Sequence, residues 1–143
     1  MPYAYVDDIA VSDVAFHAWG PSLDDTFREA AEATVHAMVD DLDSIAAVEQ
    51  RSFELHDESL DLLLLQFLQE FVYYKDAERL LLRVQDVRIS RDEHGFTLRG
   101  HAAGERINPD THELGADVKA VTLHRLQVVE TAEGWDATVI LDV

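Results

Sequence analysis

The first hydrophobic pattern in the chain has the two-residue period of a β-strand. It predicts extended structure from Tyr3 to Trp19, with an interruption near Asp7–Asp8. Beyond Val11 the two faces separate, with Val14, Phe16 and Ala18 on one side and Asp13 and His17 on the other. Gly20-Pro21 ends this region, so a second element is expected to begin at once.

A helix is predicted from Ser22 to about Val39. Ser22 is a favourable N-cap, and Asp25 stands at the third helical position, as in a capping box with Asp in place of Glu. Apolar side chains then recur every three or four residues, which is the spacing of one buried helix face. The members of this face are Leu23, Phe27, Ala30, Ala31, Thr34, Val35 and Met38.

A strand is predicted across Ile45–Leu55, and a second helix begins at Asp57 or Ser59. Over residues 60–74 this helix is apolar around most of its circumference. Such a helix is normally buried, either in a core or at an interface with another chain. The pattern alone leaves both alternatives open.

The second half of the chain is predicted to consist of strands and turns. Leu80–Ile89 changes phase near Asp86, which indicates a β-bulge. The remaining predicted elements are the strand Phe96–Glu105, the turn Asn108-Pro109-Asp110, and a final hairpin of Val118–Glu130 with Trp135–Val143. The order predicts one α+β domain over residues 1–143, with two helices packed on a mixed, largely antiparallel sheet.

The charge of the chain limits the classes of partner that it can be expected to bind. The 143 residues carry 29 acidic against 11 basic side chains, a formal net charge of −18. A field of this sign repels phosphate backbones, so direct binding to nucleic acid is not expected. Two explanations of the acidity compete: hydration of the whole surface in a salty cytoplasm, and a local acidic docking face or cation site.

Composition and motifs also exclude several classes of protein. There is no cysteine, which excludes disulfides and thiolate metal sites. No apolar segment reaches the roughly 20 residues of a membrane span, and the N-terminus lacks the features of a signal peptide, so a cytoplasmic location is expected. The chain has no phosphate-binding glycine loop, no nucleophile elbow and no histidine pair with zinc spacing, so we do not expect an enzyme.

Two aspartates at strand positions are the most informative polar residues. Asp13 lies inside the first strand region, where Asp is unfavourable, and Asp142 lies in the last strand next to Val143, which supplies the terminal carboxylate. If these strands run side by side, three anionic groups converge, and hard oxygen ligands of this kind suit Ca²⁺ or Mg²⁺. The alternative is that both aspartates face water on edge strands.

Several segments together resemble the archease family. They are Ser12-Asp13-Val14, Ala18-Trp19-Gly20, Ser22-Leu23, Phe27, Ala30-Ala31, Leu68, Glu70, Tyr73, Gly104-Glu105, Asp110, His112–Gly115, Val118–His124 and Ile140–Val143. The resemblance covers nearly the whole chain. It departs from the family where His-Thr-Ala-Asp is usual, because these positions are Ala10, Val11, Ser12 and Asp13, and Leu123 stands where Tyr is common.

The resemblance implies a function and a site. Archeases are accessory proteins of the RtcB-type tRNA-splicing ligase, so this chain is expected to promote guanylylation of that ligase and its multiple turnover. The family carries a divalent metal, calcium, which maps to Asp13, Asp142 and Val143 here. Lys119 and His124 are expected to support this tip or to contact the partner; both can also pair with nearby acids.

Two other functions remain to be compared with the structure. One is a metal-dependent hydrolase of small substrates that uses Asp13, His17 and Asp142. The other is a structural interaction module that dimerises through the apolar helix over residues 60–74.

Overall fold

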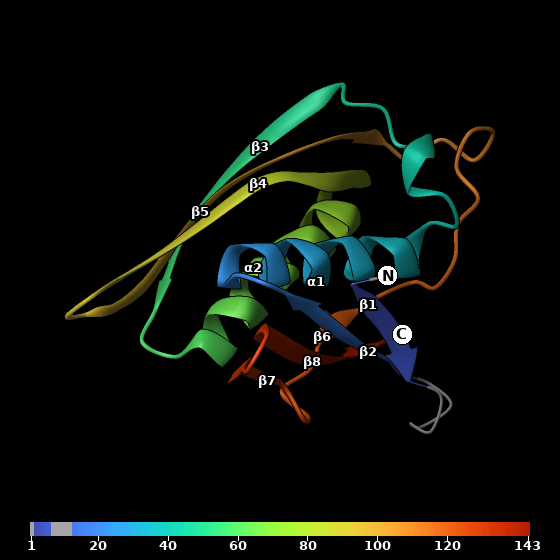
Figure 1. Ribbon diagram of the computed structural model, residues 1–143. Helices are drawn as coiled ribbons and strands as arrows, with labels where there is room; N and C mark the ends of the chain where they lie inside the picture. The colour runs from blue at the N-terminus through green and yellow to red at the C-terminus, as the bar shows by residue number, and fades with distance from the viewer. Residues whose placement is uncertain (1, 7–12) are drawn as a thin grey trace.

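The computed structural model of the protein describes residues 2–6 and 13–143, which form three layers (Figure 1). Two helices, α1 (Leu23–Met38) and α2 (Leu60–Glu78), lie between two β-sheets. The lower sheet in this view contains β1 (Tyr3–Val6), β2 (Asp13–Gly20), β6 (Ala120–Val121), β7 (Gln127–Thr131) and β8 (Gly134–Asp142). The upper sheet contains β3 (Glu49–Asp57), β4 (Leu80–Asp92) and β5 (Gly95–Arg106).

Helix α1 begins as the sequence predicts. Ser22 Oγ accepts a hydrogen bond from Asp25 N–H at 3.1 Å and donates one to Asp25 Oδ2 at 2.9 Å. The predicted apolar face is buried, with Phe27, Ala30 and Ala31 fully inaccessible to solvent. The helix ends at Met38 because Val39 is extended and forms a β-bridge with Leu114.

Helix α2 belongs to the core of one chain. The rings of Phe67 and Phe71 have centroids 5.2 Å apart, and Phe53 of β3 packs against both. Such edge-to-face aromatic packing adds to the gain from burial. The helix is apolar on most sides because both sheets cover it, so its composition requires no second copy of the chain.

The lower sheet brings the first and last long strands together. β2 pairs antiparallel with β8 along its whole length, from Asp13 opposite Asp142 to Gly20 opposite Trp135. β1 adds to the other edge of β2, while β6 and β7 both pair with β8. Every pairing between the described strands is antiparallel.

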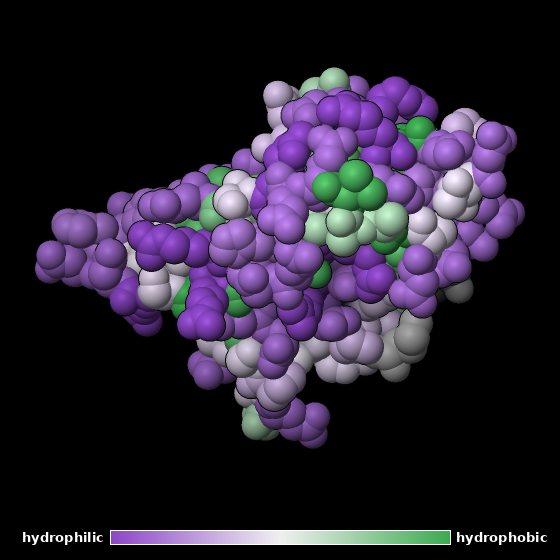
Figure 2. Space-filling model, turned by 90° about the horizontal axis from the view of Figure 1, so that it is seen from above, coloured by the Kyte–Doolittle hydropathy of each residue, from purple (hydrophilic) through white to green (hydrophobic). Residues whose placement is uncertain are grey.

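The upper sheet has the order β3-β5-β4 and contains the predicted bulge, between Val84 and Asp86. Its outer face carries the cross-strand row Glu54, Arg99 and Arg88. Figure 2 views the molecule from this side and shows a mostly hydrophilic surface with a small hydrophobic area. The helices pack against the opposite face of the sheet.

The α+β class, the single domain layout and the two packed helices match the prediction, and several details of the strands differ. The sheet is divided in two, with the helices between the halves. The predicted strand Ile45–Leu55 begins only at Glu49. Among the described residues, neither helix combines the length and the apolar character needed to span a membrane.

The predicted strand Val118–Glu130 is wrong as one element, because it is two short strands separated by a turn. Thr122 caps the first of them, since its N–H and Oγ1 both donate to Ile140 O, at 3.0 Å each. The chain then turns at Arg125, which has a left-handed φ of 55°. It rejoins β8 where Val128 N–H donates to Asp61 Oδ1 of α2 at 2.7 Å.

Candidate functional site

Asp13 and Asp142 lie directly opposite each other across the β2–β8 ladder. Cross-strand partners share one face of a sheet, with Cβ atoms about 4.5–5.5 Å apart. Val14 and Leu141, the next pair in the register, contact the hydrophobic core, so the aspartates point to the face turned away from the helices. The first and last long strands therefore do run side by side, which is the condition under which the two carboxylates converge.

Two like charges in this position repel each other, and each aspartate is only half-buried. Directly opposed like charges destabilise a sheet by a few tenths of a kcal/mol up to about 1 kcal/mol. A cation placed between the two carboxylates would remove this cost. The pair is thus chemically suited to a hard divalent cation.

The donor set available to such a cation is small. Within residues 2–6 and 13–143, no three histidine, aspartate or glutamate side chains form a group that could hold a metal. Calcium takes six to eight oxygens, so Asp13 and Asp142 need additional oxygens from main chain, water or a bound partner. Val143 follows Asp142 and packs against the core, which keeps its main chain at this end of the ladder.

Lys119 reaches the same end of the sheet from a distant part of the chain. Its N–H donates to Asp142 O at 2.8 Å, and the neighbouring Ala120 pairs with Asp142 in β6. Its side chain is exposed. The structure therefore places the main chain of Lys119 beside Asp142, whose side chain shares the end of the ladder with Asp13.

His124 lies further along the chain, in the exposed turn that Leu126 N–H closes by donating to Leu123 O at 3.2 Å. The family departure at Ala10 falls outside the described residues.

His17 is not part of this cluster. It shares a face of β2 with Asp13 but stands four positions away, about 13 Å along the strand. Its Nδ1 donates to Asp136 Oδ1 at 2.9 Å, and Thr138 Oγ1 lies 3.4 Å from its Nε2. The three residues named for a hydrolase are thus not gathered at one point, and the geometry does not favour that function.

A buried lysine holds the loop that leads to Lys119, and sequence reasoning missed it. Lys75, 7% exposed, donates to Asp117 Oδ1 at 2.7 Å and to Val118 O at 2.5 Å, and its Nζ forms a salt bridge with Asp76 Oδ1 at 2.7 Å. The hydrogen bond from Lys75 lowers the pKa of Asp117 below its usual value. The available signal was a lysine in the last turn of an otherwise apolar helix, where a cation needs a partner.

His112 holds the start of the same loop. It is 2% exposed, and its Nδ1 accepts from Asn108 N–H at 2.9 Å, so its Nε2 carries the proton donated to Glu105 Oε1 at 2.7 Å. The hydrogen bonds from Ala46 N–H and His112 lower the pKa of Glu105. Together Lys75 and His112 fix the segment that delivers residues 118–121 to β8.

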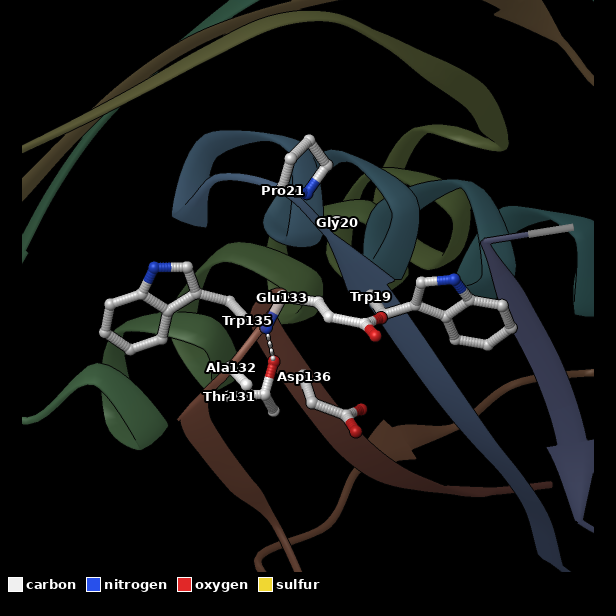
Figure 3. A pocket seen from close by; sticks show the side chains of 8 residues that line it. All are labelled: Trp19, Gly20, Pro21, Thr131, Ala132, Glu133, Trp135 and Asp136. Carbon is white, nitrogen blue, oxygen red and sulfur yellow. Dashed lines mark hydrogen bonds between the residues drawn. The ribbon is translucent and has the colours of Figure 1, made fainter.

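Sequence reasoning also missed a cleft at the opposite end of the β2–β8 ladder (Figure 3). It has a volume of about 500 Å³. Its lining consists of Trp19, Gly20, Pro21, Thr131, Ala132, Glu133, Trp135 and Asp136. No local signal marks it, because it forms only where the β7–β8 turn meets the β2–α1 junction.

Comparison with known proteins gives a consistent result. The pattern of the Archease protein family matches residues 3–143. "Protein archease" of Pyrococcus abyssi is 32% identical over 133 residues, which cover 92% of this chain and 93% of that protein. "Protein archease" of Methanopyrus kandleri is 31% identical over 143 residues, the full length of both chains.

Two solved structures share the fold. The solution structure of Methanobacterium thermoautotrophicum protein 1598 is 31% identical, with a TM-score of 0.84 over 99% of each chain. The crystal structure of an archease, "possible chaperone", from Thermotoga maritima is 17% identical, with a TM-score of 0.64 over 94% of this chain and 93% of that one. At this lower identity the second likeness concerns the fold alone.

Proposed function

Since the chain belongs to the archease family, we propose that it activates an RtcB-type tRNA-splicing RNA ligase. Its action would be to promote guanylylation of the ligase and so to permit multiple turnover. The observation that supports this most directly is the register that sets Asp13 opposite Asp142 at one end of the β2–β8 ladder. An activator of this kind needs an exposed group that can enter a partner's nucleotide pocket.

The proposed working end consists of Asp13, Asp142 and the carboxylate of Val143, which together would hold a divalent cation, calcium in the first instance. The cation would supply positive charge near the phosphates of GTP during attack on the α-phosphorus. The two aspartates would orient it and keep it exposed to the partner. The ligase supplies the nucleophile, so this protein carries out no covalent step.

Lys119 is suited to contact with the partner because its peptide group is fixed to Asp142 while its side chain remains exposed. We place His124 in the same contact, on the exposed turn that follows β6. Pairing of Lys119 with Asp117 is the competing role, since the positive charge of Lys119 contributes to the lowered pKa of Asp117.

The negative charge of the chain favours action on the ligase over direct contact with RNA. With a net charge of −18, the protein is proposed to act in the cytoplasm on the ligase and to leave the RNA to it. Attraction to a basic protein surface is the complementary prediction, and it weakens as salt increases.

The test is multiple-turnover RNA ligation by the cognate ligase, with and without this protein. We expect stimulation by the unmodified chain, and about a tenfold or greater loss of stimulation with Asp13→Asn or Asp142→Asn. Asp40→Asn is the charge-matched control, because Asp40 is exposed just after α1 and belongs to neither β2 nor β8. Full stimulation by both folded site variants would contradict the proposal.

A further inference from the structure

The chain has two tryptophans, and both line the cleft at the far end of the β2–β8 ladder (Figure 3). Trp19 is six residues beyond Asp13 along β2, so the cleft lies about 20 Å from the aspartate pair. Trp19 remains 41% exposed, although tryptophan is among the side chains most costly to leave in water. The cleft is therefore a separate surface that the proposed cation site does not use.

The walls of the cleft are held in place by contacts between distant segments. Gly134 has a φ of 146°, and a Cβ there would collide with the carbonyl oxygen of Gly20. The β7–β8 turn can therefore approach the β2–α1 junction closely only because residue 134 is glycine. Thr26, fully buried in α1, donates to Ser22 O at 3.0 Å and lies 3.4 Å from Trp135 O.

Carboxylates accompany the exposed indole. Asp136 is the cross-strand partner of Trp19, so the two side chains share one face of the sheet, and Glu133 lines the same cleft from the turn. Trp135 pairs with Gly20 and stands on the other face, so it forms the opposite wall. Figure 3 shows the two indoles on either side, with the acidic side chains between them in this view.

This combination of groups is chemically selective. Among the residues that the structure describes, the lining contains two acids and no basic side chain. The chain has a net charge of −18, so phosphates and nucleotides are disfavoured. An exposed indole face attracts cations, and a carboxylate beside it can accept their hydrogen bonds. A guanidinium satisfies both at once, because it is planar, stacks on aromatic rings and presents a fork of donors.

We infer that this tryptophan cleft docks an arginine side chain carried by a basic segment of a protein partner. The arginine would stack on Trp19 and donate to Asp136 and Glu133. His17 already engages Asp136 Oδ1, which leaves the orientation of that carboxylate set before binding. Identification of the partner as the ligase rests on the proposed function, whereas binding of arginine by the cleft does not.

The first experiment needs no ligase. The probe is the peptide N-acetyl-glycyl-arginyl-glycinamide, titrated while the two indole N–H resonances are followed by NMR, and Trp19→Phe assigns them. We expect saturable binding in the millimolar range, with shifts at Trp19 and the amides of residues 131–136. The matched peptide with citrulline in place of arginine keeps the shape, loses the charge, and should bind at least about fivefold more weakly.

Variants locate the binding and guard against misfolding. Trp19→Ala should abolish the shifts, and Glu133→Gln, a change in an exposed turn, should weaken binding about two- to fivefold without disturbing the core. Asp13→Asn, at the other end of the ladder, should bind the peptide normally. Equal binding of the citrulline peptide, no indole shift, a stronger shift with GMP, or self-association through the cleft would each overturn the inference.

A second experiment separates failure of this inference from failure of the proposed function. In the ligation assay Glu133→Gln should raise the concentration of this protein needed for half-maximal stimulation, while the stimulated rate at saturation is unchanged. Asp13→Asn should instead lower the saturated rate. A Glu133→Gln chain with an unchanged half-maximal concentration would show that the cleft does not contact the ligase.

Discussion

The two ends of the β2–β8 ladder are built from the same pair of strands but carry different sets of side chains. One end sets two carboxylates opposite each other, and the other sets a tryptophan opposite an aspartate beside a second tryptophan. The first end depends on a loop pinned by Lys75 and His112, whereas the second is closed by tight packing at Gly20 and Gly134. Hence a change that disturbs one end should leave the other intact.

The largest effect is expected when the ammonium group of Lys75, which holds the loop that leads to Lys119, is removed. Lys75→Met should lower the free energy of unfolding by about 3 kcal/mol, because Val118 O loses a buried donor and Asp117 loses its partner. Amide exchange should accelerate over residues 107–121 and remain slow around Trp19. Denaturant unfolding and hydrogen exchange measure the two parts, and uniform acceleration at both ends would show that the ends are coupled.

Calcium should stabilise the protein through the carboxylate end of the ladder and not through the tryptophan end. At a concentration 100 times its Kd the ion should stabilise the unmodified chain by about 2.7 kcal/mol, with the gain lost in Asp142→Asn and retained in Trp19→Ala. Thermal unfolding with and without the ion is the measurement. Equal stabilisation of the Asp142→Asn chain would place the ion elsewhere.

Whether Asp13→Asn raises or lowers the stability of the fold should depend on whether calcium is present. In chelator the variant should be more stable than the unmodified chain by about 0.2–1 kcal/mol, because two opposed like charges become one. With calcium present the order should reverse, since the variant lacks a ligand. Asp40→Asn, measured alongside, should show no such reversal, and a variant less stable in both conditions would contradict the repulsion argument.

The smallest expected effect is the loss of the Lys75–Asp117 ion pair's contribution to stability at low pH. The pKa of Asp117 is lowered by Lys75, so this ion pair stabilises the fold above the unfolded-state pKa of about 3.9 and is lost as the pH falls through the lower folded-state value. The stability gap between the unmodified chain and Asp117→Asn, about 0.5 kcal/mol at neutral pH, should therefore shrink and close as the pH falls below the unfolded-state pKa and through the lower folded-state one. Urea unfolding against pH tests this, and a gap that widens in acid would refute the assigned direction.

Local patterns predicted much of this molecule. The cap at Ser22, the bulge near Asp86 and the strand position of Asp13 follow from side chains within a few residues of each other. The pattern singled out Asp13 and Asp142 as polar strand positions, but that they lie opposite each other followed only if the two strands were neighbours, which the register now shows.

The features that the sequence did not predict depend on contacts between residues far apart in the chain. The sheet divides because α2 is apolar enough to be covered on two sides, and its periodicity alone does not say by what. The tryptophan cleft requires Gly134 to meet Gly20, which are 114 positions apart in the chain. A local pattern cannot report such a meeting.

The central claim is that the carboxylate end activates a ligase, and covalent transfer of GMP from α-labelled GTP to the cognate ligase tests it most directly. With divalent cation present, the unmodified chain should accelerate formation of the ligase–GMP adduct. Asp142→Asn should fall at least about tenfold short of this acceleration, while Asp40→Asn matches the unmodified chain. Equal acceleration by folded Asp142→Asn protein, or none by the unmodified chain, would contradict the account.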